Sequence, residues 1–194
     1  MKRKILFLLA VVSSLTIGCQ SVKFDRQAYT WTVLAGKPGT PGSADGTGSV
    51  ARFLRPCGVA VDNVGNLYVV NGDCTIRKVD SSGKVTMLAG CPGNCGNIDG
   101  TCSAARFDYP EGVAVDSDGN VYVADRVGST IRKVTPLGVV MTIAGSAGST
   151  GSADGIGSAA RFNFPWGVAV DTAGNLYVAD FGNHCIFKGT PSKR

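Results

Sequence analysis

The chain has 194 residues, of which 44% are hydrophobic and 27 are glycine, and its formal net charge is +5. Three of the 19 basic side chains lie in the first four residues, which leaves 16 basic side chains against 14 acidic ones. A charge this close to balance, scattered along the chain, excludes the broad basic surface of a nucleic-acid-binding protein. We therefore expect no nucleic-acid partner.

The first predicted element is an export signal. Residues 2–4 are Lys, Arg and Lys, and an apolar run extends from Ile5 to Val12 and continues weakly to Ile17. This run of roughly 13 residues is too short to span a bilayer as a helix, which needs about 20. After it, residues 15–19 read LTIGC and resemble the lipobox of bacterial lipoprotein precursors, whose cysteine becomes the lipidated N-terminus.

This resemblance implies a signal peptide over residues 1–18, a lipid anchor on Cys19 and a short linker over residues 19–28. Two or more acyl chains hold a protein stably on a membrane. By the same resemblance, Gln20 directly after the cysteine implies the outer membrane or the cell surface of a bacterial envelope. The alternative is an ordinary cleaved signal, with Cys19 left as a free or disulfide-bonded thiol.

Residues 29–190 are built from a repeat. The stretch ARFLRPCGVAVDNVGNLYVVN at 51–71 returns in similar form at 105–125 and 160–180, at spacings of 54 and 55 residues. A fixed period of this length indicates a repeat architecture. Residues 29–36, YTWTVLAG, have the pattern of the last strand of a repeat with no earlier strands before it, and residues 191–194 form a tail.

Each full repeat predicts four strands, as the middle copy illustrates. Its segments GVAVD, NVYVAD, STIRKVT and VVMTIAG alternate apolar and polar residues and are rich in β-branched side chains. Asp116 and Gly119 lie between the first two segments, where they favour a tight hairpin turn. The third copy has only three such segments. Four successive antiparallel strands make one propeller blade, so the expected fold is an all-β propeller with three blades per chain.

The repeat PxGVAVDxxGNLYVAD…IRKVTPxGxVxTxAG resembles the NHL repeat, which occurs in β-propellers of usually six blades. Its usual N-H-x-I element survives at residues 183–186, but residues 128–131 and 72–76 depart from it. NHL propellers include lyases, relatives of hydrolases, and modules that bind protein or RNA. The resemblance therefore implies a fold more than a function.

A long glycine-rich loop connects each repeat to the next, and in each loop an Asp precedes an Arg by seven positions. We expect each pair to order its loop through an ion pair or a clamp on the backbone, and the alternative is a ring of charge around a ligand funnel. The pairs are Asp45 and Arg52, Asp99 and Arg106, and Asp154 and Arg161.

Six cysteines other than Cys19 favour disulfides in an exported chain. Cys57 lies at the start of a first strand, and Cys74 lies in the turn that returns to the same edge, so the sequence predicts a bridge between them. At least one further bridge should lie within Cys91, Cys95 and Cys102, and the sequence does not determine which two of them pair. No histidine lies near these cysteines and their spacing matches no common zinc site, so we expect neither a metal nor a cofactor.

The candidate ligand face is the edge at which first strands begin and second strands turn back into third strands. Trp166 and Tyr109 flank prolines there, and His184 is the single histidine of the chain, too few for the metal sites of propeller enzymes. Partial burial between blades is the alternative for the two aromatic residues. The candidate residues are Trp166, His184, Asp125, Asp180, Arg52, Arg106 and Arg161, and the predicted topology places the five disulfide candidates and the connecting loops on the same face.

We therefore expect a membrane-anchored binding or scaffold module without catalytic activity, whose ligand is a protein, a peptide or a carbohydrate. The alternatives are a truncated or degenerate propeller enzyme, similar to a lactonase, hydrolase or lyase, and a gene fragment without independent function. Three blades are too few to close a ring. The sequence therefore also predicts a homodimer in which residues 29–36 of each chain complete the last blade of the other, against a monomeric arc whose own termini pair.

Overall fold

The computed structural model describes residues 28–192. The chain divides into two compact units, Met1–Thr32 and Val33–Arg194. In the described part of the first unit, residues 28–32, the rings of Tyr29 and Trp31 lie 6.1 Å apart. The predicted signal peptide and the predicted lipidation site, Cys19, lie outside the described residues.

Residues 28–192 contain no helix long and apolar enough to cross a membrane.

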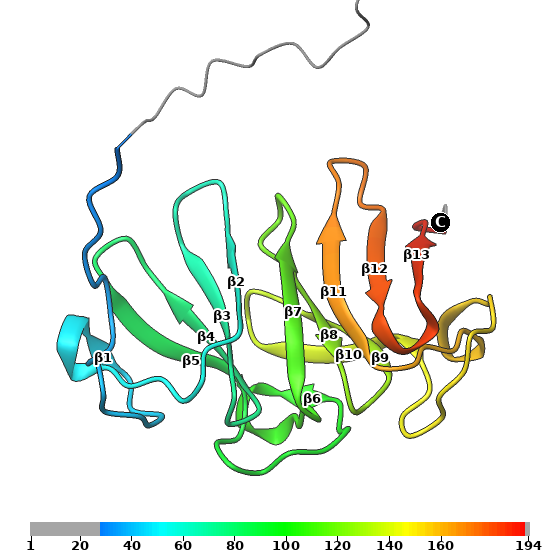
Figure 1. Cartoon of the computed structure of the whole chain (residues 1–194), viewed down its shortest axis with the longest axis horizontal. Coiled ribbons are helices and arrows are strands. Elements are labelled where there is room, and N and C mark those ends of the chain that lie inside the picture. The colour runs from blue at the N-terminus through cyan, green and yellow to red at the C-terminus, as the bar shows by residue number, and fades with distance from the viewer. Residues whose placement is uncertain (1–27, 193–194) are drawn as a thin grey trace, which may run out of the picture. The chain divides into compact units, whose positions relative to one another are not determined.

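The second unit consists of three antiparallel sheets, as Figure 1 shows, which confirms the predicted all-β fold of propeller blades. Blade 1 has the strand order β1-β5-β4-β3-β2, blade 2 the order β6-β10-β9-β8-β7, and blade 3 the order β11-β12-β13. The strands of blade 1 are β1 (Gly46–Thr47), β2 (Gly58–Val61), β3 (Leu67–Asn71), β4 (Thr75–Val79) and β5 (Lys84–Gly90). Those of blade 2 are β6 (Gly100–Thr101), β7 (Pro110–Val115), β8 (Val121–Asp125), β9 (Thr130–Val134) and β10 (Val139–Gly145). Those of blade 3 are β11 (Pro165–Val170), β12 (Leu176–Asp180) and β13 (Cys185–Gly189). Short 3-10 helices lie at η1 (Gly48–Val50), η2 (Cys102–Ala104), η3 (Gly157–Ala159) and η4 (Phe181–Asn183).

The hairpin between the first two long strands of each blade forms as predicted. The carboxylate of Asp116 accepts hydrogen bonds from the backbone N–H groups of Asp118 at 3.0 Å and Asn120 at 2.8 Å, and from the hydroxyl of Tyr122 at 3.0 Å. Burial alone would raise the pKa of Asp116, but these bonds and that from the Asn120 side chain outweigh it and lower the pKa. The carboxylate is thus held by its own turn.

Two features of the sheets differ from the prediction. Blades 1 and 2 have five strands, because Gly46–Thr47 pairs with β5 and Gly100–Thr101 pairs with β10. These two-residue strands are too short to produce a periodic pattern in the sequence. The expected strand over residues 29–36 is absent, since residues 28–36 include no strand in the structure.

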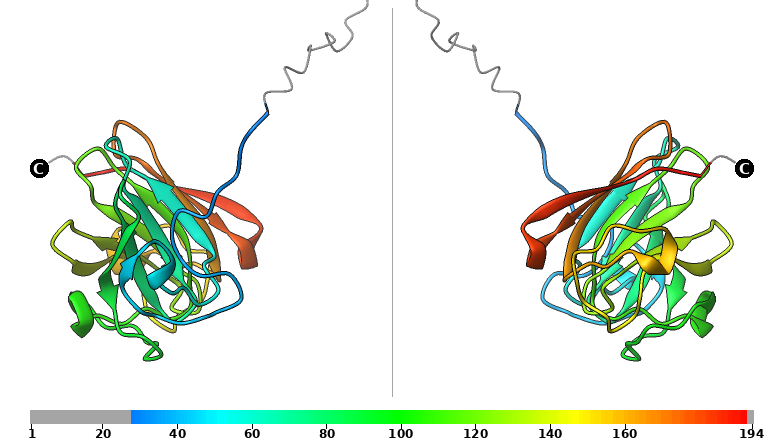
Figure 2. Two further views of the ribbon diagram at one scale, coloured as in Figure 1. Left: turned by 90° about the vertical axis from the view of Figure 1, so that its left-hand side faces the viewer. Right: turned by 90° about the vertical axis from the view of Figure 1, so that its right-hand side faces the viewer.

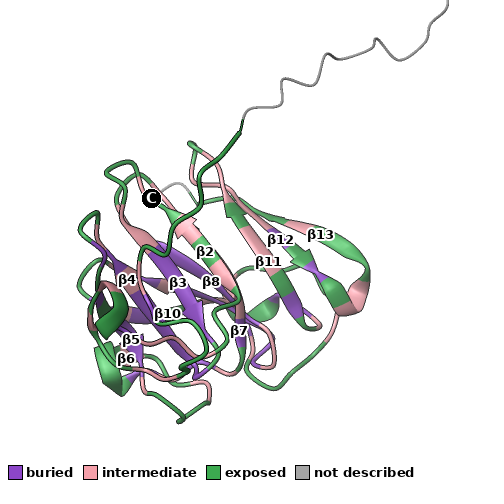
Figure 3. Cartoon of the chain, turned by 60° about the vertical axis from the view of Figure 1, so that its left-hand side comes forward, coloured by how far each residue is buried: buried purple, intermediate pink, exposed green. Residues whose placement is uncertain are grey.

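The hydrophobic core lies between neighbouring blades. One cluster, which includes Phe107, joins β3, β4 and β5 of blade 1 to blade 2, and a second cluster, which includes Phe162, joins blades 2 and 3. Figure 3 shows the middle strands β3 and β8 as buried, whereas β2 and β13 include exposed residues. Figure 2 views this row of sheets from its two ends.

Glycine lets the inner strands of adjacent blades approach closely. β7 lies between β2 and β11. A Cβ atom on Gly112 would come within 2.5 Å of the backbone oxygen of Trp166 and 2.8 Å of the Cα atom of Gly167. Only a residue without a side chain fits at this seam.

Candidate functional site

The candidate site is what we call the start edge, the edge of the sheets at which β2, β7 and β11 begin and β3, β8 and β12 turn into the next strand. At this edge, residues other than glycine adopt positive φ angles. One set directly precedes the prolines that open the inner strands: Arg55 at 46°, Tyr109 at 55° and Phe164 at 53°. A second set lies in the turns: Cys74 at 67°, Ser129 at 54° and His184 at 57°. Left-handed backbone in non-glycine residues is costly and gathers at functional sites.

The residue after each repeat proline lies at the start of an inner strand. These equivalent residues are Cys57, Glu111 and Trp166, one from each blade. The thiol of Cys57 lies 3.6 Å from the backbone oxygen of Pro110 and close to the carboxylate of Glu111. The three blades therefore contribute a thiol, a carboxylate and an indole along one edge.

Arg126 links the carboxylate to the indole. Its Nε atom lies 3.4 Å from Oε1 of Glu111, and its guanidinium carbon lies 5.5 Å from the ring centre of Trp166. The rings of Trp166 and Phe181 are 5.5 Å apart. The backbone N–H of Arg126 donates to the backbone oxygen of Tyr109 at 3.3 Å, so the backbones of these two residues are neighbours at this edge.

We call these five residues, Tyr109, Glu111, Arg126, Trp166 and Phe181, the aromatic cluster. Its three aromatic residues remain exposed, with 47% of Trp166, 53% of Tyr109 and 62% of Phe181 accessible to solvent. A hollow of about 450 Å³ lies beside Trp166 and is also lined by Phe181 and His184. The cluster therefore combines apolar ring faces with one ion pair at an open surface.

The thiol of Cys57 is held in its protonated form. Residue Cys57 as a whole is exposed, but desolvation of its sulfur, followed by the negative charge of Glu111, raises the thiol pKa to about 11. A thiolate is the reactive form of cysteine. At neutral pH Cys57 therefore acts as a neutral hydrogen-bond donor.

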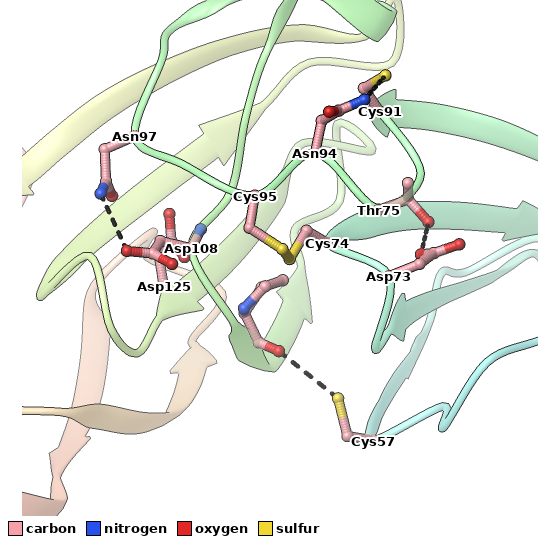
Figure 4. The surroundings of a disulfide bond; sticks show 11 residues. Cys57, Asp73, Cys74, Thr75, Cys91, Asn94, Cys95, Asn97, Asp108 and Asp125 are labelled. Carbon is pink, nitrogen blue, oxygen red and sulfur yellow. Dashed lines mark hydrogen bonds between the residues drawn. A yellow bond between two sulfur atoms is a disulfide. The ribbon is translucent and has the colours of Figure 1, made fainter.

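The predicted bridge between Cys57 and Cys74 is wrong. Cys74 is bonded to Cys95, with their Cα atoms 5.4 Å apart, as Figure 4 shows. Cys57 precedes β2 and Cys74 precedes β4, so one whole strand, β3, lies between them. Two strand spacings amount to roughly 10 Å, beyond the limit of about 7 Å for a disulfide. The bridge instead ties the β3–β4 turn of blade 1 to the loop that leads into blade 2.

The remaining disulfide candidates do not form a second bridge with each other. Cys57, Cys91, Cys102 and Cys185 are free among the described residues. Cys102 lies at the opposite edge of the sheets, where its backbone N–H donates to Gly138 at 2.8 Å, next to the β9–β10 turn. The expectation that all connecting loops stay on one face is therefore wrong, because each loop runs along the outer strand to the far edge and back.

The loop aspartates do form ion pairs, but not with the arginines seven positions later in the sequence. Asp45 pairs with Arg77, and Asp99 pairs with Arg132 at 2.7 Å, so each loop is held to the third strand of the following blade. Arg132 also bonds the buried carboxylate of Asp125 at 2.9 Å. Burial raises the pKa of Asp125, and the charge of Arg132 opposes this.

The arginines of the predicted pairs instead clamp the backbone. Arg52, Arg106 and Arg161 donate to carbonyl oxygens of their own loops, including that of Ser49 at 2.6 Å and that of Ser103 at 2.5 Å. This is one of the two structural roles expected from the sequence.

Of the predicted ligand-face residues, the structure places Trp166 and His184 together at the exposed hollow. Asp125 and Asp180 are buried, and Asp180 accepts bonds from the backbone of Asn163 at 2.9 Å and the side chain of Asn183 at 2.7 Å. Glu111, Arg126 and Phe181 were not predicted. The signal that could have found them is positional, since Glu111 and Trp166 both follow a repeat proline.

In the part of the chain that the structure describes, no three His, Cys, Asp or Glu side chains gather closely enough to hold a metal ion.

Similarities to known proteins agree with the blade fold of the three sheets. Residues 162–188 match the NHL repeat, and residues 88–154 match the teneurin NHL domain. The chain is 30% identical to NHL repeat-containing protein 3 of Homo sapiens over 112 residues, which are 58% of this chain and 30% of that protein. It is 33% identical to NHL repeat-containing protein 2 of Bos taurus over 150 residues, 70% of this chain and 21% of that protein.

The crystal structure of an auxiliary nutrient binding protein from Bacteroides thetaiotaomicron superposes with a TM-score of 0.60 at 26% identity, over 67% of this chain and 36% of that one. The fold is thus that of propeller blades. The chain therefore contains NHL repeats and folds into blades of the β-propeller type. It spans about a third or less of the length of these relatives.

Proposed function

We propose that the chain is a binding module anchored to the bacterial envelope, and that the aromatic cluster holds its ligand. The observation that carries this proposal is the exposed indole of Trp166, whose ring centre lies 5.5 Å from the guanidinium carbon of Arg126 and 5.5 Å from the ring centre of Phe181. Binding sites are typically apolar and aromatic with a few placed polar groups. The cluster has that composition.

The chemistry of the cluster suits a carbohydrate. A sugar ring presents an apolar C–H face that packs on an aromatic ring, and hydroxyl groups that bond to charged side chains at its rim. Trp166 and Phe181 offer the aromatic faces, and Arg126 with Glu111 offers a donor and an acceptor. The 26% identical structure named above is described as a nutrient binding protein, which supports a binding role.

The proposed membrane anchor is a lipid attached to Cys19. The sequence LTIGC supports lipidation at this residue and hence a place at the outer membrane or the cell surface. A module held there and built from exposed aromatic residues would capture soluble ligands close to the membrane.

A fluorescence titration tests the site. The chain has two tryptophans, Trp31 and Trp166, so Trp31→Phe leaves Trp166 as the sole reporter. We expect a soluble oligosaccharide of glucose, mannose or N-acetylglucosamine to change its emission.

Calorimetry with the same sugar provides the control. Trp166→Ala should abolish binding, whereas Leu137→Ala, an exposed residue at the opposite edge, should leave it unchanged. Binding that survives Trp166→Ala, or a panel in which no sugar binds, would contradict the proposal.

A further inference from the structure

The outer edge of blade 3 lacks the fourth strand that blades 1 and 2 have at this position. We call the hollow beside β13 the slot. In blades 1 and 2 the third strand is covered by a fourth strand, β5 or β10, which is covered in turn by the two-residue strand β1 or β6. In blade 3, residues 155–156 are the equivalents of these two-residue strands. Within the described residues no strand pairs with the outer edge of β13.

The slot is apolar and open. Its volume is about 530 Å³, and its apolar lining includes Ile131, Ala144, Phe162, Val178 and Phe187. Asp154 and Gly155 also line it. An unpaired strand edge beside an apolar floor is a template for another strand.

Asp154 offers the polar contact that a fourth strand uses in the other blades. Asp45 accepts a hydrogen bond from the backbone N–H of Met87 in β5 at 3.2 Å, and Asp99 accepts one from Thr142 in β10 at 3.0 Å. Both carboxylates also hold an arginine of the third strand. In blade 3 that arginine is replaced by Phe187, so the carboxylate of Asp154 has no such cation to hold.

Residues 31–36 have the sequence of the missing strand. They read WTVLAG, against VTMLAG at 85–90 and VMTIAG at 140–145. Val33 is therefore the equivalent of Met87 and Thr142, the residues whose N–H groups bond to the loop aspartates.

Within this segment, Ala35 already packs as its equivalents in the fourth strands of blades 1 and 2 do. Ala35 lies against the cluster of Ala51, Val69 and Phe53 on blade 1, as Ala89 packs against Phe107 and Ala144 against Phe162. Gly36 and Gly90 have matching φ angles of 94° and 95°. Nevertheless, residues 33–36 pair with no strand, and 65% of Val33 is exposed.

We propose that the slot beside β13 accepts residues 31–36 of a second copy of this chain. Ala35 of the chain's own segment lies on blade 1. The two open ends of the row are separated by blade 2, whose faces are filled by core clusters on both sides. Closing this row on itself would make a ring of three blades, whereas propellers have about four to eight. Two copies related by a two-fold axis form two identical joints and a ring of six blades. This proposal does not depend on the proposed function.

The repeat gives the register of the joint. Ile76 pairs with Ala89, Arg77 with Met87 and Lys78 with Thr86 in blade 1. By equivalence, Thr32 of one copy lies opposite Lys188 of the other, and Val33 lies opposite Phe187.

Native mass spectrometry of the full chain in detergent tests the proposal. We expect a mass twice that of one chain, which is 20.0 kDa for the sequence as given. Val33→Pro removes the N–H that would bond to Asp154 and should yield the mass of one chain. Ser81→Pro is the matched control, because Ser81 occupies the second position of the β4–β5 turn, where proline is favoured, and it should leave the dimer intact. A wild-type monomer, or a Val33→Pro variant that remains dimeric, would overturn the proposal.

Cross-linking of mixed variants identifies the occupant of the slot. Chains with Thr32→Cys are mixed with chains with Lys188→Cys and oxidised, and the bridged peptides are mapped. We expect a disulfide between residues 32 and 188 of different chains, and none when Ser81→Cys replaces Thr32→Cys. Failure to form the bridge in the mixture would overturn the assignment of the segment, even if the protein is dimeric.

Discussion

Arg132→Met should be among the most damaging single substitutions in the chain. The guanidinium of Arg132 is fully buried, bonds Asp125 at 2.9 Å and Asp99 at 2.7 Å, and donates to the backbone oxygens of Arg106 and Ile98 at 3.0 Å each. Methionine fills a similar volume but leaves the buried carboxylate of Asp125 without a cation. Breaking a buried pair in this way costs about 3–5 kcal/mol.

Urea unfolding followed by circular dichroism at 25 °C and at one fixed protein concentration measures this loss. Arg126→Met is the matched control, because its ion pair with Glu111 is partly exposed and 3.4 Å long, and such pairs are worth about 0–1 kcal/mol. If the two variants lose equal stability at pH 8, the buried network of Arg132 does not hold the loop as argued.

The pH dependence of the same variant gives a second test. Burial raises the pKa of Asp125, to about 7 in the native protein, whereas an unfolded Asp titrates near 4. A group whose folded pKa is raised lowers stability as the pH rises from its unfolded to its folded pKa. Removal of Arg132 raises the folded pKa further, so the deficit of Arg132→Met should stay nearly constant below about pH 6 and grow above about pH 7, where Asp125 ionises in the wild type but stays protonated in the variant. A deficit that does not grow as the pH rises above about 7 would contradict the role of Asp125.

Three further predictions concern the bridge, the blade seam and the anchor. Cys95→Ser opens a disulfide with a sequence separation of 21 residues, and the chain-entropy model gives a loss of about 3 kcal/mol in the free energy of unfolding; a wild type equally stable with and without reductant would contradict this. Gly112→Ala places a methyl group 2.5 Å from the backbone oxygen of Trp166, whereas the Cβ of Gly167→Ala would meet only a side chain at 3.5 Å. Thermal melting should therefore show a loss of about 2 kcal/mol or more for the first variant and little for the second. Cys19→Ser should move the protein from the membrane fraction to the soluble fraction, and an unchanged fractionation would rule out the lipid anchor.

The sequence predicts the strands well because each follows from local information. Alternation of apolar residues and the turn chemistry of Asp116 and Gly119 define the hairpins within a few residues of each other. The three-fold recurrence then identifies a repeat architecture, since the same local solution occurs at a fixed spacing.

The errors concern which groups meet across long distances. The sequence indicated that Asp99 helps to order its loop, but the nearest arginine along the chain, Arg106, is not its partner. Arg132 is, 33 residues away, because the loop folds back along the outer strands of the following blade. Likewise, Cys57 and Cys74 share an edge of one sheet, but β3 separates them, so Cys74 meets Cys95 in the next loop. Which blade a loop contacts is a property of packing between repeats, and no single repeat encodes it.

Blade 3 holds its loop with a different kind of contact, and this difference bears on the slot. In blades 1 and 2 the arginine of the third strand lies over a loop phenylalanine, at 5.6 Å for Arg77 and Phe53 and at 5.3 Å for Arg132 and Phe107. Blade 3 replaces the arginine by Phe187, which packs edge-on against Phe162 with ring centres 5.1 Å apart.

An aromatic pair of this kind is worth about 0.5–1.5 kcal/mol beyond its buried area and requires no carboxylate. The loop of blade 3 is therefore held by Phe162 without an ion pair to Asp154. Asp154 keeps its full hydrogen-bonding capacity for the backbone of an incoming strand. A blade that must receive its fourth strand from another chain needs both properties, because its loop must be ordered before the strand arrives and its acceptor must be unoccupied.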